Sequence, residues 1–284
     1  MRKPDYTIRT MTRSEMDCCI EWAAREGWNP GLHDAEAFYQ ADAEGFLVGL
    51  LDGEPIASIS AVRYGTDFGF IGFYIVRPEY RAKGYGLAIW KQAMARLQGR
   101  LIGLDGVVAQ QENYRRSGFE FAYNNIRYQT LTQSVQVDAK GDLVDVDEVS
   151  QTELFAYDSR CFAQQREAFL EYWVRQPDCH AKAVLTNGVL RGFGVMRACR
   201  VGYKIGPLFA DDGMFARQIY GALAGCVEPG LQIQLDIPAQ NPQAQSLVNA
   251  LQMKPVFETA RMYTGCAPAL DMHRMFGVTT FELG

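Results

Sequence analysis

Residues 73–88 read Phe73-Tyr74-Ile75-Val76-Arg77-Pro78-Glu79-Tyr80-Arg81-Ala82-Lys83-Gly84-Tyr85-Gly86-Leu87-Ala88. The apolar run that ends at Val76 is typical of a strand that is covered on both faces. From Tyr85 onward the apolar residues recur at the spacing of an amphipathic helix. A buried strand therefore passes through a short loop, with two basic residues and two glycines, directly into a helix.

This loop has the features of an anion-binding site. The first N–H groups of a helix have no partner inside the helix, and the helix dipole places partial positive charge there. Gly84 and Gly86 leave room for a phosphate near the backbone, and Arg81 and Lys83 add positive charge beside it. We therefore expect phosphate binding; the alternative is an ordinary helix start with solvated basic residues. A Rossmann loop fits poorly, because Ile89 stands where its third glycine would be.

The elements around the loop mix strands and helices. In the first half we expect strands at 6–9, 45–51, 54–63, 68–76, 101–108 and 119–130, and helices at 13–26, 34–40, 85–97 and 111–117. Thr12 and Glu15 fit a capping box in front of the first helix. Asp52-Gly53, between two apolar runs, indicates a hairpin turn.

The second half repeats this succession in outline. We expect helices at 153–163, 166–174, 213–227 and 241–251, and strands at 181–185, 189–197, 200–209, 231–237 and 256–264. Asn187-Gly188 marks its hairpin. The similar order predicts an internal duplication and an α/β fold with a mixed (α+β) sheet. Residues 132–150 are polar and acidic, so we place one domain at 1–132 and a second at 140–284. If the halves fold independently, a fragment ending near residue 135 retains its own ligand binding.

Composition narrows the function classes. The chain has 284 residues, 48% of them hydrophobic and 21% charged, which is ordinary for a soluble protein of two domains. A net charge of −5 argues against general nucleic-acid binding. The sequence contains no apolar run long enough to span a membrane and no apolar segment behind its basic start, so we expect a cytoplasmic protein with no membrane partner.

Cysteine and histidine give no metal pattern. The seven Cys include no C-x-x-C pair, and the three His lie far apart in the sequence. We therefore expect reduced, mostly buried thiols and no metal.

The loop and its flanks resemble the GCN5-related N-acetyltransferase (GNAT) superfamily. The matching residues are Arg81-x-x-Gly84-x-Gly86, preceded by Val76-Arg77-Pro78, and Asn113-Tyr114-Arg115-Arg116-Ser117-Gly118-Phe119 after the next strand. The resemblance is strong over 45–125 and weaker over 6–44. It implies tandem GNAT-like acyl-CoA N-acyltransferase domains, of which the first is catalytic.

The resemblance also implies which residues bind acetyl-CoA as cosubstrate. The loop amides would hold the pyrophosphate, and the strand before the loop would splay away from the next one. Tyr74 and Val76 would then offer main-chain hydrogen bonds near the thioester carbonyl and the pantetheine arm. The implied cofactor-binding residues are Tyr74, Val76, Arg81, Ala82, Lys83, Gly84, Tyr85, Gly86 and Leu87.

For catalysis the resemblance points to Tyr114, which stands four residues before Gly118. Its phenol would protonate the leaving CoA thiolate; the alternative is that Tyr114 packs as an ordinary helix aromatic. A base is missing, because Phe70 occupies the position at which many relatives place a Glu. Asp67, Glu36 and His33 are the side chains considered for this role, besides a water molecule or an amine that arrives neutral.

The second half has no Arg-x-x-Gly-x-Gly motif. Where the CoA loop would be it reads Gly206-Pro207-Leu208-Phe209-Ala210-Asp211-Asp212. The two carboxylates would repel a pyrophosphate, so we expect this degenerate half to shape the acceptor pocket or an interface.

Together these patterns predict an N-acetyltransferase that carries an acetyl group from acetyl-CoA to a primary amine by direct attack. The alternative function is a non-catalytic acyl-CoA-binding sensor. The expected partner is a small-molecule amine, and a homodimer is left open. Small amines, amino acids, aminosugars and protein Lys all stay open as acceptors.

Overall fold

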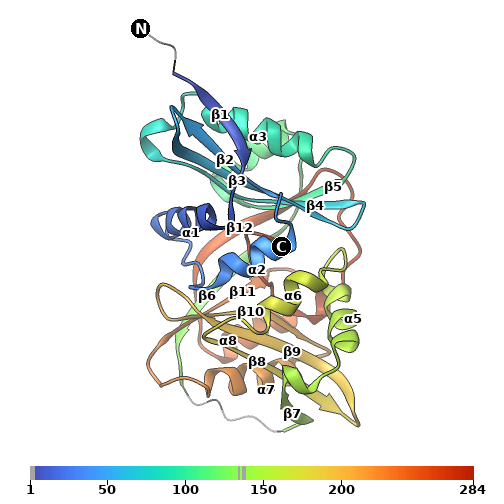
Figure 1. Ribbon diagram of the computed structural model, residues 1–284. Helices are drawn as coiled ribbons and strands as arrows, with labels where there is room; N and C mark the ends of the chain where they lie inside the picture. The colour runs from blue at the N-terminus through green and yellow to red at the C-terminus, as the bar shows by residue number, and fades with distance from the viewer. Residues whose placement is uncertain (1–3, 134, 136–138) are drawn as a thin grey trace.

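The computed structural model describes residues 4–133, 135 and 139–284. Over these residues the strands form one mixed sheet of thirteen strands, which runs through both halves of the molecule (Figure 1). The strands follow the order β1-β2-β3-β4-β5-β12-β6-β11-β10-β9-β8-β7, and β13 pairs with β10.

The first half has the succession that the sequence predicts. Its strands are β1 (Tyr6–Thr10), β2 (Phe46–Leu51), β3 (Glu54–Tyr64), β4 (Phe68–Val76), β5 (Leu101–Val107) and β6 (Glu120–Leu131). Its α-helices are α1 (Met16–Arg25), α2 (Asp34–Ala41), α3 (Tyr85–Arg96) and α4 (Gln111–Arg116). The segment expected at 13–26 begins with a 3-10 turn over Arg13–Glu15, where the Glu15 carboxylate accepts a 2.8 Å hydrogen bond from the Thr12 amide.

The second half follows the same order. Its strands are β7 (Asp142–Asp145), β8 (Cys179–Thr186), β9 (Val189–Ala198), β10 (Tyr203–Ala210), β11 (Gln232–Pro238), β12 (Lys254–Tyr263) and β13 (Met275–Gly277). Its α-helices are α5 (Gln151–Cys161), α6 (Glu167–Trp173), α7 (Gly213–Ala224) and α8 (Pro242–Ala250). The order β-α-α-β-β-β-α-β-α-β therefore occurs twice, as an internal duplication requires.

Both predicted hairpin turns are confirmed by their backbone. Asp52 and Gly53 have φ of 49° and 87°, and Asn187 and Gly188 have φ of 51° and 75°. Two successive positive φ angles define the type I′ turn that Asp-Gly and Asn-Gly favour.

The two halves exchange their last strands. β12 of the second half lies between β5 and β6, and it pairs antiparallel with both. β6 of the first half pairs on its other side with β11 of the second half. The predicted boundary at 132–140 therefore separates the halves along the chain, but the sheet continues across it.

We expect a fragment ending at residue 135 to be unable to fold alone. It would leave the edge of β5 open and β6 without either neighbour, because β11 and β12 both come later in the chain. Circular dichroism during heating should show no cooperative transition for this fragment, and mixing it with residues 139–284 should restore one. A cooperative transition of the fragment by itself would contradict the strand exchange.

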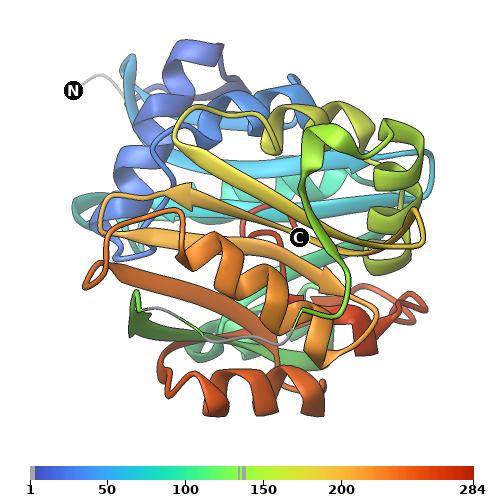
Figure 2. The same cartoon turned by 90° about the horizontal axis from the view of Figure 1, so that it is seen from below.

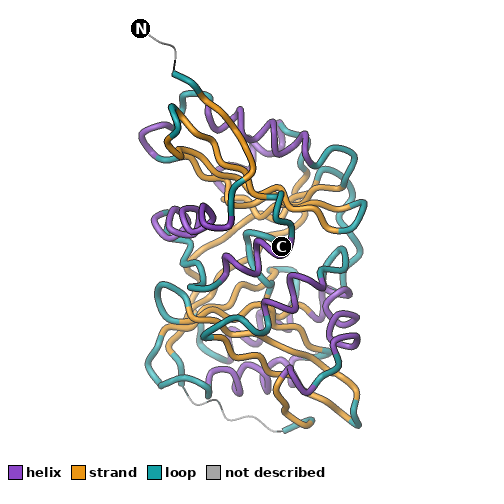
Figure 3. The backbone as a smooth tube through the Cα atoms, viewed as in Figure 1, coloured by secondary structure: helices purple, strands orange, loops and turns teal. Residues whose placement is uncertain are grey.

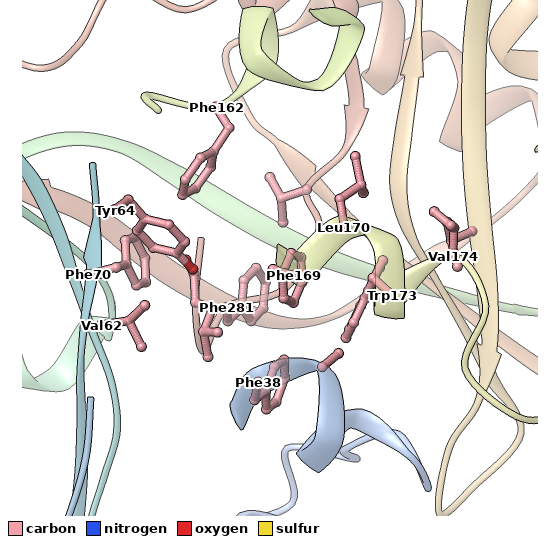
Figure 4. Packing of buried hydrophobic residues seen from close by; sticks show 14 of the residues in the cluster. Phe38, Val62, Tyr64, Phe70, Phe162, Phe169, Leu170, Trp173, Val174 and Phe281 are labelled. Atoms are coloured by element: carbon pink, nitrogen blue, oxygen red, sulfur yellow. The ribbon is translucent and has the colours of Figure 1, made fainter. Parts of the chain in front are cut away.

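Three hydrophobic clusters hold the sheet and helices together. The largest lies under α1, α2, α5 and α6 and draws residues from both halves. In it, Phe38 of α2 stacks on Phe169 and Trp173 of α6, with ring centroids 6.4 and 5.7 Å apart (Figure 4). The other clusters lie beneath α3 in the first half and beneath α7 and α8 in the second. In Figure 2, α1 and α5 lie on one side of the sheet and α7 and α8 on the other.

The last residues of the chain run into the middle of the molecule rather than over its surface (Figure 3). Residues 275–284 are all buried. We call residues 278–284 the C-terminal tail. Arg166 donates to the carbonyl of Gly284 at 3.0 Å, and Tyr64 donates to the carbonyl of Leu283 at 3.1 Å. One contact comes from each half, so both halves fix the tail.

Other expectations from the sequence are only partly met. All seven cysteines are free, but only Cys19, Cys161 and Cys199 are buried, so the expectation of mostly buried thiols is wrong for the other four. β7 and β13 were not expected, because strands of four and three residues leave too short a pattern. No helix in the described part of the chain is long and apolar enough to cross a membrane.

Candidate functional site

The loop before α3 leaves the start of that helix open. Gly84 is the N-cap with φ of +89°, and no side chain caps the helix. Ala82 also has a positive φ, of 60°. The first turn of α3 contains no acidic residue. Its N–H groups and its dipole therefore face outward without a competing negative charge, which favours an anion.

Gly84 and Gly86 are required for different structural reasons. A Cβ on Gly84 would meet no atom within 4 Å, so this position needs glycine for its backbone angle and lies beside open space. A Cβ on Gly86 would lie 2.7 Å from the Tyr74 hydroxyl and 3.1 Å from Val76 Cγ2. Gly86 therefore admits the Tyr74 side chain, and its lack of a Cβ is not explained by phosphate approach alone.

The two basic side chains of the loop, Arg81 and Lys83, form bonds within the protein. Arg81 donates from Nε to the carbonyl of Val76 at 2.7 Å and forms an ion pair with Glu26. Lys83 donates to the carbonyl of Glu79 at 2.8 Å. Arg81 thus holds the loop against the end of β4 and Lys83 holds it to the turn at Glu79, while both side chains stay exposed to solvent. Leu87, on the first turn of α3, is exposed as well.

β4 and β5 splay apart beside this loop. They pair in parallel only from Phe68 with Leu101 to Ile71 with Leu104. Beyond this point Phe73 has φ of 45°, and its carbonyl accepts a 2.9 Å hydrogen bond from Ser58 Oγ on β3. The irregularity lies where the register of β3 and β4 shifts. It turns the end of β4 away from β5. Tyr74 and Val76 therefore lie on the part of β4 that no longer pairs with β5.

A cavity opens between the splayed strands and extends to the strands that the two halves exchange. Its walls come from β4, β5, α3, α4, β6, β12 and the C-terminal tail. Its volume is about 60 Å³. Trp28, Phe257 and Phe281 form part of the lining, together with the polar residues Asp105, Arg127, Thr259 and Glu282.

Tyr114 lies on this cavity. Its ring packs on Gly106 of β5, where a Cβ would be 2.2 Å from a ring carbon, and its centroid is 5.6 Å from that of Trp90. The ring of Tyr74 also packs on Trp90, with centroids 5.4 Å apart. Burial raises the pKa of Tyr114 to about 12. The phenol therefore keeps its proton throughout the neutral range, as a general acid must.

The residues considered in connection with the base lie outside the cavity. Phe70, which stands where many relatives have a Glu, is fully buried beneath Arg261. Asp67 is exposed in the turn before β4. Glu36 pairs with Arg13 at 2.7 Å, and His33 bonds Asp178 at 2.9 Å. None of these residues lines the cavity.

Two acidic residues do line it, Asp105 and Glu282. Sequence reasoning missed both. Asp105 was detectable as a charged residue inside an otherwise apolar strand, whereas nothing in the sequence marks Glu282. Asp105 accepts bonds of 2.8 and 2.6 Å from Arg261 and one of 2.9 Å from Asn125, so its oxygens are already occupied.

In the second half, side chains of the chain itself occupy the start of α7, which corresponds to the open start of α3. Asp212 caps α7 by accepting from the amides of Met214 at 2.9 Å and Phe215 at 3.1 Å, and it pairs with Lys140. Gln243 Oε1 accepts from the amide of Gly213 at 2.9 Å. The positive end of α7 is therefore neutralised by a carboxylate of the chain, as the expected repulsion of a pyrophosphate requires.

The splay of the second half is filled as well. β10 and β11 pair only from Tyr203 to Ile205 on β10. Beyond that, β13 pairs with Leu208 and Phe209. The amide of Val278 then donates to the carbonyl of Asp236 on β11 at 2.8 Å. A segment of the chain thus occupies the gap that stays open in the first half.

Comparison with known proteins agrees with this duplicated architecture. The model of the acetyltransferase (GNAT) family matches residues 9–119, and that of an acetyltransferase (GNAT) domain matches 154–277. The holothin acyltransferase of a Pseudoalteromonas species is 30% identical over 280 residues, which cover 98% of this chain and 95% of the relative. The chain belongs to the GNAT acyltransferases. As a GNAT protein of two domains, it is an acyltransferase of a fold family that uses acyl-CoA.

Solved GNAT structures share its fold. A Pyrococcus horikoshii protein assigned as an acetyltransferase aligns over 100% of this chain and 98% of its own, with a TM-score of 0.84 and 21% identity. A tandem GNAT protein from the clavulanic acid biosynthesis pathway aligns over 93% of this chain and 100% of its own, with a TM-score of 0.66 and 11% identity. At these identities the likeness concerns the fold alone.

Proposed function

We propose that this GNAT protein transfers an acetyl group from acetyl-CoA to a primary amine, at the site between α3 and the splayed strands β4 and β5. The observation that carries the proposal is the contrast between the two halves. In the first half the start of α3 is uncapped and the strand gap opens into a cavity. In the second half the carboxylate of Asp212 and strand β13 fill the equivalent places.

The residues around the loop fit an acyl-CoA. The amides of Ala82, Lys83, Gly84, Tyr85, Gly86 and Leu87 are the proposed pyrophosphate ligands. Arg81 and Lys83 would add positive charge from the rim. The backbone of Tyr74 and Val76, beyond the end of the β4–β5 pairing, is the proposed partner of the pantetheine amides and the thioester carbonyl.

Tyr114 is the proposed general acid. The amine nitrogen attacks the thioester carbon, a tetrahedral intermediate forms, and the carbon–sulfur bond then breaks. Tyr114 donates its proton to the departing sulfur, and its pKa of about 12 keeps that proton available beforehand. The products are an amide and the free thiol of CoA.

Cavity size supports a short acyl group. The volume of about 60 Å³ is well below the ~150 Å³ of an engineered cavity that holds benzene. An acetyl group fits such a space without displacing a wall. The name of the holothin acyltransferase states an acyl transfer to holothin, and it supports a small-molecule acceptor here.

Thiol release tests the proposal. Purified protein is mixed with acetyl-CoA and each of a panel of primary amines, while free thiol and the amide product are measured together. We expect release that depends on the amine, with one amide formed for each thiol. Binding of acetyl-CoA with no release for any amine would favour the alternative of an acyl-CoA sensor.

A further inference from the structure

We propose that Glu282 is the base that accepts the proton of the acceptor amine, and that the acceptor is an amine without an anionic group. This inference rests on the proposed function and deepens it. It names a catalytic base, which β4 does not supply. It also favours one class of amine substrate among those that the sequence does not distinguish.

Glu282 reaches the site through the C-terminal tail. Its backbone lies directly against β4, since a Cβ on Gly72 would be 2.0 Å from the Glu282 carbonyl oxygen. Gly72 is one residue before the turn in β4 at Phe73, after which the strands splay. The tail therefore places Glu282 on the same cavity as Tyr114, although the two residues come from different halves of the chain.

The carboxylate of Glu282 is held at one oxygen and free at the other. Thr280 Oγ1 donates to Oε2, and the same hydroxyl accepts from the Glu282 amide at 2.9 Å. Among the described residues no group bonds to Oε1, and no cation forms an ion pair with Glu282. The side chain is only 5% exposed. A carboxylate oxygen without a donor, on a residue that lines a cavity, is suited to take a proton from a ligand.

Another residue of the cavity carries an unsatisfied polar group. Thr259 of β12 is 3% exposed and lines the same cavity, and its hydroxyl has no hydrogen-bond partner. Buried polar groups are normally paired, so Thr259 indicates that a polar ligand atom or a water belongs beside it in the cavity.

Arg127, a cation of the cavity lining, and Arg261, a cation of the neighbouring strand β12, already have partners. Arg127 bonds Asp236 twice at 2.7 Å and the carbonyl of Trp28 at 2.8 Å. Arg261 makes its two bonds to Asp105. Neither guanidinium is left to receive a carboxylate or phosphate of a substrate. An acceptor with such a group would bring an unpaired negative charge next to Glu282, which is unfavourable in a buried site.

Several charged groups surround Glu282 and set its electrostatic environment. Arg127 on β6, Arg197 on β9 and Lys204 on β10 are close enough for the charge of Glu282 to act on them. Arg197 bonds Asp34 at 2.7 Å, and Lys204 donates to the carbonyl of Trp28 at 3.3 Å.

The proton transfers balance. Glu282 takes one proton from the ammonium form of the amine and passes it to solvent, and the neutral nitrogen then bonds to the thioester carbon. The carboxylate takes the second proton from that nitrogen as the carbon–sulfur bond breaks, and Tyr114 gives its proton to sulfur. Solvent removes the second proton from Glu282 and restores that of Tyr114, so the net change is thioester and ammonium to amide, thiol and one proton.

The substitution Glu282→Gln tests the base. It should lower kcat about 10²–10⁴-fold, the range for loss of a general base, and leave the Kd for acetyl-CoA unchanged. The defect should shrink as the pH rises toward the pKa of the amine, because the amine then arrives neutral. The matched control is Glu258→Gln, at an exposed position of β12 that bonds Asn124. It should keep the rate of the unsubstituted protein.

Two results would overturn the assignment of Glu282. One is an unchanged kcat for a folded Glu282→Gln protein. The other is a defect of equal size at every pH, since a group that only positions the amine would give no recovery. If neither protein releases thiol with any amine, the proposed function fails instead, and the two failures are thereby distinguished.

The acceptor class is tested on the unsubstituted protein, so it does not depend on the folding of a variant. Propylamine and β-alanine have nearly the same shape, but β-alanine carries a carboxylate in place of the terminal methyl group. We expect kcat/KM to be at least about 100-fold lower for β-alanine, which corresponds to about 2.7 kcal/mol. Equal values would overturn the proposed exclusion of anionic acceptors.

Discussion

Replacing Tyr114 with Phe should lower kcat about 10²–10⁴-fold and leave the affinity for acetyl-CoA nearly unchanged. The substitution removes one hydroxyl and keeps the ring that packs on Gly106 and Trp90. Stopped-flow detection of free thiol measures the rate, and calorimetry measures the affinity. Tyr220→Phe is the matched control, because it removes the hydroxyl of a buried tyrosine on α7, away from the cavity.

The pH profile adds a second check on Tyr114. A tyrosine with an ordinary pKa near 10 would begin to lose its proton at about pH 9, and the rate would fall. Burial raises the pKa of Tyr114 to about 12, so the protonated acid persists to higher pH and no fall is expected up to about pH 11. A Tyr114→Phe protein with the unsubstituted rate would exclude Tyr114 as the acid. A smaller drop is expected if thiol departure is not rate-limiting.

Gly84→Asp should weaken acetyl-CoA binding about 100-fold or more. The space beside Gly84 is open, so the new carboxylate would lie at the start of α3, where the pyrophosphate is expected. Two unit charges about 4 Å apart at an effective dielectric constant of about 20 repel by about 4 kcal/mol, and solvent at this exposed loop reduces that figure. Asp212 on α7 already shows how one carboxylate caps the start of a helix in this fold.

Gly84→Asn is the control for this second prediction. Asn has the shape of Asp without its charge, and both residues tolerate a positive φ better than most, here +89°. We expect Asn to weaken binding clearly less than Asp in the same titration. Equal affinities for the unsubstituted protein and the Asp variant would remove the loop from the site. Equal losses for Asp and Asn would assign the effect to shape rather than charge.

Local signals in the sequence predicted the elements that local chemistry determines. The loop from Arg81 to Gly86, the hairpin turns at Asp52-Gly53 and Asn187-Gly188, and the repeated order of elements all follow from backbone preferences and short-range patterns. Tyr114 was located differently, because only the resemblance to the GNAT family gives a meaning to a tyrosine four residues before Gly118. The structure places it on the cavity.

Non-local pairing could not be predicted in this way. An apolar strand such as β12 pairs equally well with several neighbours, so its position between β5 and β6 depends on the whole fold. Glu282 lies on a tail with no periodic pattern, and only the packing of that tail against Gly72 brings it to the site. Because the sequence does not reveal how the tail packs, it offered only Asp67, Glu36 and His33 as side chains for the base.

The stoichiometry of acetyl-CoA binding tests most directly the claim that the first half alone carries the acyl-CoA site. Isothermal titration of the full chain measures the number of sites, and the same titration of Gly84→Asp assigns them. We predict one acetyl-CoA per chain and a large loss of that single affinity in the variant. Two sites per chain, or one site that Gly84→Asp leaves unchanged, would contradict the account.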